Sequence, residues 1–273
     1  MPRPIVFLSD FGLEDEFVGV CHGVLNRIAP DSRVIDLTHG VPAQDVLRGA
    51  LMLAESIPYM PEDAVYLAVV DPGVGMARAD LAVRTRSGNH LVGPDNGVLS
   101  LSWERLGGAE RAVDIRSPEV TSPVVSSTFH GRDVFAPAAA HLATGMPIEV
   151  MGPRLDTGAL VTVRVAEPHV RPGRVRAQVL DRDRFGNVQL NVRHRHLEAA
   201  ALHRVRELEL RISGRSRRLP RATAFGEVEE GQCAAIFDSR GWFALICNGG
   251  SAAEALGLAV GDGVVLLEPD AGG

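Results

Sequence analysis

The pattern of apolar residues changes near residue 160, and this change constrains the fold more than any other feature. Before it, continuous apolar runs alternate with stretches whose apolar residues recur at helical spacing. This alternation is typical of a parallel sheet covered by helices. After it, strand-like segments follow one another between turn signals, which is typical of an antiparallel sandwich or barrel. We therefore predict an α/β domain with a mostly parallel sheet over residues 1–160 and an all-β barrel or sandwich domain over 161–273.

The same pattern places individual elements. Pro30 and Pro58 each follow a helical stretch, and proline ends helices because it lacks a backbone N–H. In the first domain we expect helices near 17–28, 44–57 and 136–144 and strands at 5–8, 33–37, 64–70, 81–85 and 90–92. In the second domain we expect strands at 161–165, 174–180, 188–192, 208–212, 234–237, 242–247 and 264–267.

The chain contains no lysine, so every basic side chain apart from histidine is arginine. This excludes the lysines of Schiff bases, P-loops and kinases, and with them pyridoxal chemistry and most phosphoryl-transfer mechanisms. The net charge of −6 disfavours nucleic acid. The arginine-rich stretch 193–221 is interrupted by glutamates and lacks aromatic residues, so we interpret it as a solvated or inter-subunit face.

Location and cysteine chemistry follow from short patterns. No apolar run is long enough to cross a membrane, and the apolar run after the N-terminus is too short for a signal peptide, so we expect a cytoplasmic protein. Cys21, Cys233 and Cys247 are widely spaced and odd in number. We expect three free buried thiols rather than a disulfide framework or a zinc knuckle.

Three expected strand ends carry an aspartate beside glycine. They are Asp10 in Ser9-Asp10-Phe11-Gly12, Asp71 in Asp71-Pro72-Gly73-Val74-Gly75, and Asp95 in Gly93-Pro94-Asp95-Asn96-Gly97. Ligands of open α/β sheets bind beyond the carboxyl ends of the strands. The set therefore predicts a negatively charged site there. Arg78 is close enough in sequence to pair with Asp71, and His130 lies in a loop just before a helix.

The sequence contains few of the motifs expected for a catalytic metal or for a serine nucleophile. The chain has no HExxH motif and no acidic cluster at ligand spacing, and the HxH pair His194 and His196 lies among arginines. No GxSxG elbow occurs. We expect no bound metal and no cofactor. In the second domain, Asp183-Arg184-Phe185-Gly186-Asn187 combines a carboxylate, an aromatic face and a carboxamide on one turn. Such a turn suits an ammonium group and a base, although a plain hairpin turn with a core phenylalanine fits as well.

Together these motifs resemble the S-adenosyl-L-methionine hydroxide adenosyltransferase family, which is related to the fluorinase and the chlorinase. The ordered strings that carry the resemblance are 9–12, 71–75, 93–97, Phe129-His130-Gly131-Arg132-Asp133, 183–187 and Asn248-Gly249-Gly250-Ser251-Ala252-Ala253-Glu254. The resemblance implies an α/β domain, a C-terminal β-barrel, and a homotrimer whose sites lie between subunits. It also implies hydrolysis of S-adenosyl-L-methionine to adenosine and L-methionine by attack of water on the ribose 5′ carbon.

The resemblance also assigns roles to residues. Asp71, Arg78 and His130 would be catalytic, Asp10 would bind the ribose hydroxyls, and Asp183 would hold the methionine ammonium. Phe185 and Asn187 would face adenine, and Ser239 and Arg240 would lie near the methionine end. Phe17 departs from a serine of the fluorinase, and the long insertion of the halogenases is missing between 75 and 93, which favours water over halide. The alternatives are a non-catalytic adenosine or S-adenosyl-L-methionine binding protein and a metal-dependent nucleotide phosphatase.

Overall fold

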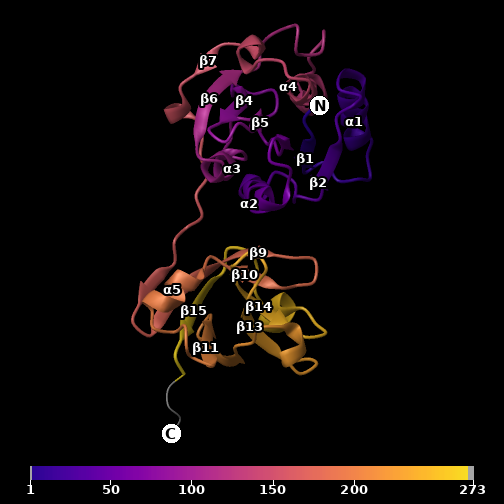
Figure 1. Cartoon of the computed structure of the whole chain (residues 1–273). Helices are drawn as coiled ribbons and strands as arrows, with labels where there is room; N and C mark the ends of the chain where they lie inside the picture. The colour runs from indigo at the N-terminus through magenta and orange to yellow at the C-terminus, as the bar shows by residue number, and fades with distance from the viewer. Residues whose placement is uncertain (1, 270–273) are drawn as a thin grey trace. The chain divides into compact units, whose positions relative to one another are not determined.

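The chain folds into two compact units, of which the first ends at Arg164 and the second begins at Val165. The computed structural model describes residues 2–269 (Figure 1). Each unit has its own hydrophobic core, as expected for independently organised domains. Within residues 2–269 no helix has the length and apolar character that crossing a bilayer requires.

The first unit is built on a mixed seven-stranded sheet of order β2-β1-β3-β5-β4-β6-β7. The pairings β2–β1, β1–β3 and β3–β5 are parallel, and the pairings from β5 through β4 and β6 to β7 are antiparallel. The strands are β1 Ile5–Ser9, β2 Val34–Thr38, β3 Val65–Val69, β4 Asp80–Thr85, β5 His90–Pro94, β6 Ala109–Asp114 and β7 Arg154–Leu155. The carboxyl ends of β1, β3 and β5 therefore lie side by side.

Helices cover both faces of this sheet (Figure 1). Alternate side chains of β1 explain why, because Phe7 enters the core under α1 and α4 while Val6 and Leu8 enter the core under α2 and α3. The helices are α1 Phe17–Ile28, α2 Val46–Ser56, α3 Ser100–Arg105 and α4 Ala136–Ala143, with short turns η1 Ile57–Tyr59, η2 Gly131–Phe135, η3 Ile148–Met151 and η4 Thr157–Ala159. The alanine-rich α4 brings its backbone close to the sheet.

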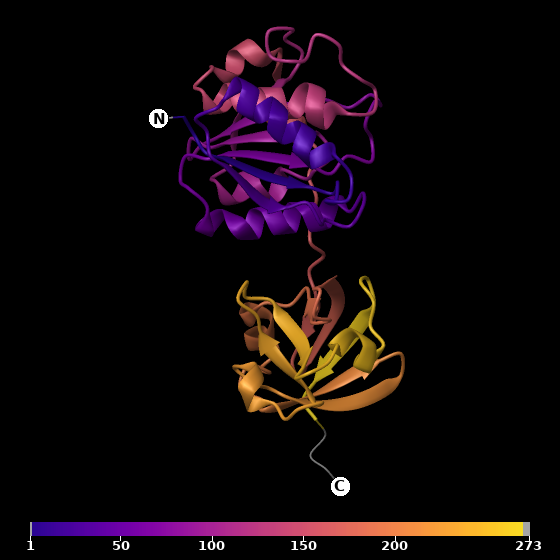
Figure 2. The same cartoon turned by 90° about the vertical axis from the view of Figure 1, so that its right-hand side faces the viewer.

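The second unit is an antiparallel sheet that curls into a nearly closed barrel (Figure 2). Its order is β12-β11-β15-β9-β10-β14-β13, with β8 paired to β9, and a bridge between Arg221 and Ala235 links the two ends. The elements are β8 His169–Arg171, β9 Arg174–Arg182, β10 Val188–Leu190, α5 His194–Ala199, β11 Glu207–Ile212, β12 Arg215–Pro220, η5 Phe225–Glu227, β13 Cys233–Phe237, β14 Phe243–Cys247, α6 Ala252–Leu256 and β15 Gly263–Leu267. Alternate side chains of β9 point inward, as a one-sided core requires.

The predicted combination of an α/β domain with an all-β barrel domain is confirmed. The first sheet is mixed rather than mostly parallel, because its pairings from β5 to β7 are antiparallel. The strand predicted at 161–165 is wrong, because residues 161–168 have no regular structure. Side chains rather than a neighbouring strand accept hydrogen bonds from backbone N–H groups of this segment. The Val161 N–H donates to Asp95 Oδ1 at 2.9 Å, and the Val163 N–H donates to Ser100 Oγ at 3.1 Å. The pattern also failed to predict α3, β6 and β12.

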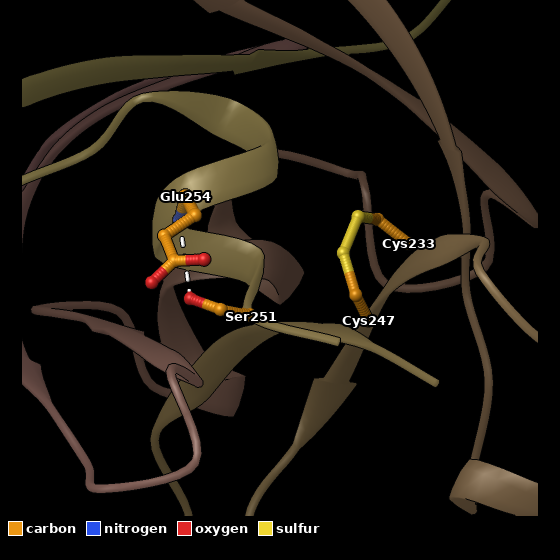
Figure 3. The surroundings of a disulfide bond; sticks show 4 residues. All are labelled: Cys233, Cys247, Ser251 and Glu254. Carbon is orange, nitrogen blue, oxygen red and sulfur yellow. Dashed lines mark hydrogen bonds between the residues drawn. A yellow bond between two sulfur atoms is a disulfide. The ribbon is translucent and has the colours of Figure 1, made fainter. Parts of the chain in front are cut away.

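The expectation of three free thiols is wrong for two of the cysteines. Cys233 and Cys247 form a disulfide (Figure 3). Cys21 is free and buried. The two residues sit directly opposite each other on β13 and β14, so that their Cα atoms are 3.9 Å apart. Their separation of 14 residues in sequence conceals this pairing, because the pairing depends on the register of two strands joined by a turn.

Candidate active site

Three carboxylates follow adjacent strands of the first unit, as the sequence predicts. Asp10 follows β1, Asp71 follows β3, and Asp95 follows β5. Burial raises the pKa of Asp10; the Gln44 N–H donates to its Oδ2 at 2.8 Å and opposes this rise, while the charge of Asp71 adds to it. Burial also raises the pKa of Asp95, whose Oδ1 is occupied by the N–H of Val161. Asp95 is thus engaged in holding the chain segment that leaves the unit.

Asp71 is held by the guanidinium of Arg78. Arg78 Nε donates to Asp71 Oδ1 at 2.9 Å, and Nη2 donates to Oδ2, which makes the pair bidentate. Both side chains are about nine-tenths buried. Burial alone would lower the pKa of Arg78, but the hydrogen bonds and charges of Asp71 and Asp80 outweigh it and raise that pKa. The guanidinium is therefore a fixed cation.

His130 joins this pair through a carboxylate that the sequence reasoning missed. Its Nδ1 lies 3.2 Å from Asp80 Oδ1 and 3.3 Å from Arg78 Nη2. Arg78 Nη1 donates to the same Asp80 oxygen. Because Nδ1 carries one proton or one lone pair, it either donates to Asp80 or accepts from Arg78. Donation to Asp80 leaves the Nε2 lone pair available. The proximity of Asp80 to Arg78 in sequence was the only signal for this residue.

The loops that carry these groups are fixed by close backbone packing. Gly75 adopts a left-handed φ of 76°, and a Cβ there would lie 2.4 Å from the carbonyl oxygen of Ser127. The loop after β3 thereby contacts the loop before His130. His130 itself precedes the π-helical turn η2, a geometry found at functional sites in other proteins. The guanidinium of Arg78 lies 5.3 Å from the ring centroid of Phe135 in this turn.

Phe17, the departure from the fluorinase pattern, belongs to an aromatic cluster. Its ring centroid lies 5.9 Å from that of Phe11 and 5.1 Å from that of Phe129. These two rings flank the Asp10 and His130 motifs respectively. Phe17 is 38% exposed, so part of the ring remains available to a ligand or partner.

The second unit contains a cavity of about 860 Å³, which is lined by all five of the binding residues predicted in this unit. Pockets for small organic ligands span roughly 300–1,000 Å³. The predicted residues are Asp183, Phe185, Asn187, Ser239 and Arg240, and the cavity is also lined by Phe225, Phe237 and Cys247. Phe185 is 68% exposed and therefore is not the core phenylalanine of a plain hairpin.

Asp183 organises its own turn. Its Oδ1 accepts the N–H groups of Phe185 and Asn187, each at 2.9 Å, and its Oδ2 accepts from Asn187 Nδ2 at 2.7 Å. Gly186 at the turn has a φ of 84°, and its carbonyl accepts the N–H of Ala253 at the start of α6. The turn that carries Phe185 is therefore fixed to α6.

The Ser239 and Arg240 turn depends on a further carboxylate that the sequence reasoning missed. Asp238 Oδ1 accepts the N–H groups of Arg240 and Trp242, each at 2.9 Å. Asp238 Oδ2 accepts from Gln189 Nε2 and lies 3.7 Å from Arg240 Nε. The two histidines with HxH spacing diverge, since His196 Nε2 contacts Glu167 Oε2 at 2.9 Å while His194 stacks on Phe237.

The first unit thus brings Asp71, Arg78 and His130 together, and the second unit contains a pocket of the size that small organic ligands occupy. Residues 5–152 match the model of the SAM hydroxide adenosyltransferase N-terminal domain, and residues 177–265 match that of the C-terminal domain. The chain belongs to the SAM hydroxide adenosyltransferase family.

Relatives and solved structures cover almost the whole chain. A Salinispora tropica protein named (R)-S-adenosyl-L-methionine hydrolase is 47% identical over 96% of this chain and 97% of its own length. A Thermus thermophilus protein of the same name is 43% identical over 97% of this chain and its full length. A Thermotoga maritima crystal structure, titled an uncharacterized conserved protein, superposes with a TM-score of 0.89 at 33% identity, covering 96% of this chain and 99% of that one.

Proposed function

We propose that this enzyme hydrolyses S-adenosyl-L-methionine to adenosine and L-methionine. The observation that carries the proposal is the clamped Asp71–Arg78 pair beside His130, in a family whose relatives at 43–47% identity are named for this hydrolysis. The sulfonium makes methionine a neutral leaving group. Catalysis then requires a water molecule held in line with the breaking 5′ carbon–sulfur bond, about 3–3.5 Å from the carbon.

We assign the water to His130 and Asp71. Both oxygens of Asp71 already accept from Arg78, so this carboxylate is suited to holding a water rather than to taking its proton. His130 Nε2 has a free lone pair when Nδ1–H donates to Asp80, and it would act as the general base. Arg78 and Asp80 are positioning residues. Asp10 would accept from the ribose hydroxyls.

The cavity of the second unit would bind the nucleoside and the amino acid. Phe185 offers an aromatic face for stacking on adenine, and the amide of Asn187 would pair with the base edge. Asp183, Ser239 and Arg240 would contact the methionine end. We further propose a homotrimer in which the first unit of one subunit and the second unit of the next form each site. The exposed rings of Phe185 and Phe225 at the cavity support this arrangement, because apolar surface of this kind favours burial by a partner. A cytoplasmic location stays a prediction.

The decisive experiment follows adenosine formation from S-adenosyl-L-methionine by chromatography in the presence of a chelator. In water enriched in heavy oxygen, attack on the 5′ carbon places the label in adenosine and leaves methionine unlabelled. Tight binding without product would identify a binding protein. Phosphate release from a nucleotide that requires added metal would identify a phosphatase. Either outcome would refute the proposal.

Subunit complementation tests the shared site. Asp71→Asn in the first unit and Phe185→Ala in the second should each suppress turnover. Co-expressed variants should recover activity, because mixed trimers contain sites in which both contributing units are intact. The double variant Asp71→Asn/Phe185→Ala, expressed alone, is the control, because none of its sites contains an intact contributing unit. Absence of recovery in mixtures proven to contain both chains would place each site within a single chain.

A further inference from the structure

A histidine–aspartate–histidine cluster lies outside the groups assigned to the reaction. His22 on α1, Asp36 on β2 and His39 just after β2 place one donor atom each within 4.8 Å of one another. Asp36 Oδ1 lies 2.8 Å from His22 Nε2 and 3.1 Å from His39 Nε2. These atoms come from two elements, so no spacing motif in the sequence indicates them.

We propose that these three side chains bind a divalent first-row transition-metal ion such as Zn²⁺. Two imidazoles and a carboxylate are a donor set that suits this class of ion. A tetrahedral site with bonds of about 2.0 Å holds its donor atoms about 3.3 Å apart. The observed separations of 2.8 and 3.1 Å reach this value with small side-chain shifts.

His39 supplies an independent observation. Its side chain is 3% exposed, and among the residues that the structure describes its Nε2 has no partner at hydrogen-bond geometry. Its Nδ1 lies 2.8 Å from Ser9 Oγ. When Nδ1–H donates to Ser9, the Nε2 lone pair faces the cluster, which is how metal-binding histidines are commonly oriented. A buried ring nitrogen without a hydrogen bond is costly, and a cation bound between Nε2 and Asp36 Oδ1 would remove this cost.

The cluster also has access to solvent. His22 and Asp36 are 35% and 45% exposed at their side chains, which leaves an entry path and room for water as a further ligand. The ion would join α1 to β2 and stabilise the folded state. The backbone of His39 also connects the cluster to the proposed active site. Its carbonyl accepts the N–H of Gly12, which lies two residues after Asp10.

Binding of Zn²⁺ to tag-free protein, stripped of metal, tests the proposal without S-adenosyl-L-methionine. Titration against a chromophoric chelator should give one ion per chain, and Co²⁺ should give the visible absorption of a low-coordinate site. The variants His22→Gln and Asp36→Asn change partly exposed side chains and should fold. Each variant should bind Zn²⁺ at least about tenfold more weakly, because replacing even a residue that only hydrogen-bonds to a metal ligand lowers metal affinity roughly 10–100-fold.

His203→Gln, at an exposed histidine of the second unit, is the matched control and should bind as the wild type does. Zn²⁺ should raise the Tm of the wild type and of this control but not that of His22→Gln. Equal Zn²⁺ affinity in the wild type and in both cluster variants would overturn the proposal, because the ion would then bind elsewhere. Failure to bind Zn²⁺ would overturn it as well, and neither result bears on adenosine formation.

Discussion

Arg78 donates to both carboxylate oxygens of Asp71, which lies seven residues earlier in the chain. The planar guanidinium fork matches the carboxylate and fixes its orientation as well as its charge. His130 lies against the same guanidinium, 3.3 Å away. The arginine therefore sets the geometry of both groups that we assign to the attacking water.

Replacing Arg78 with lysine should slow adenosine formation at least about 100-fold, because a misplacement of about 1 Å at the reacting groups costs this much. Lysine keeps the charge but cannot form the bidentate pair. Initial rates at saturating substrate measure the effect. Arg84→Lys on β4 is the control, since Arg84 forms an exposed pair with Glu110 at 3.1 Å, and its rate should stay near that of the wild type. A wild-type rate in Arg78→Lys would remove the clamp from the mechanism.

Gly186→Ala should lower the Tm and weaken adenosine binding. Its φ of 84° disfavours any side chain, and a Cβ would lie 2.2 Å from Ser251 Oγ, the group that caps α6. Gly214→Ala separates the two effects, because Gly214 has a φ of 82° and open space around its Cβ position. The control should lose about 1 kcal/mol, and Gly186→Ala should lose about 1–3 kcal/mol more. Equal losses of unfolding free energy in the two variants would show that Ser251 moves aside for the new Cβ without an energetic cost.

His90 should destabilise the protein in acid. Burial, with the charges of Arg3 and Arg84, lowers its pKa from 6.5 to about 4. The unfolded chain therefore binds a proton between these values while the folded chain does not, so stability is complete above pH 6.5 and falls as the pH drops toward 4. The total loss is about 3 kcal/mol. His90→Gln should show a smaller loss of stability between pH 7 and pH 4 in chemical denaturation, whereas the exposed control His169→Gln should match the wild type.

Thiol counting tests the disulfide. Denatured protein isolated under oxidising conditions should react with one equivalent of thiol reagent per chain, at Cys21, and with three equivalents after reduction. Reduction should lower the Tm, because the bond restricts the unfolded chain. Most cytosols keep thiols reduced, so the count in freshly lysed cells also reports on the compartment. Three reactive thiols before reduction would contradict the bond.

Much of the fold could be predicted because buried helices and strands carry apolar residues at a recognisable spacing in the sequence. Strands such as β1 and β3 are buried throughout and almost entirely apolar, which is typical of a strand covered on both faces. The segment 161–165 misled the prediction because its valines alternate as in a strand, although its N–H groups are satisfied by Asp95 and Ser100. The strand β12 escaped prediction because its residues are almost all exposed arginines and other polar residues.

The site could be predicted only in part. Asp10 and Asp71 were predicted correctly to follow strands whose ends adjoin, because parallel topology alone brings these ends together. Asp80 and Asp238 were missed because they orient other groups, a role that no motif marks. For Asp80 the only signal was its proximity to Arg78 in sequence. The pairing of Cys233 with Cys247 depends on strand register, which a spacing of 14 residues does not encode.

The chain passes from the first unit to the second through a single irregular segment, residues 161–168. The residues proposed to position the attacking water and the cavity proposed to bind the nucleoside are therefore encoded by separate, consecutive parts of the gene. A designed chimera that joins two family members within residues 161–168 would exchange the cavity of the second unit as one piece and leave Asp71, Arg78 and His130 unchanged.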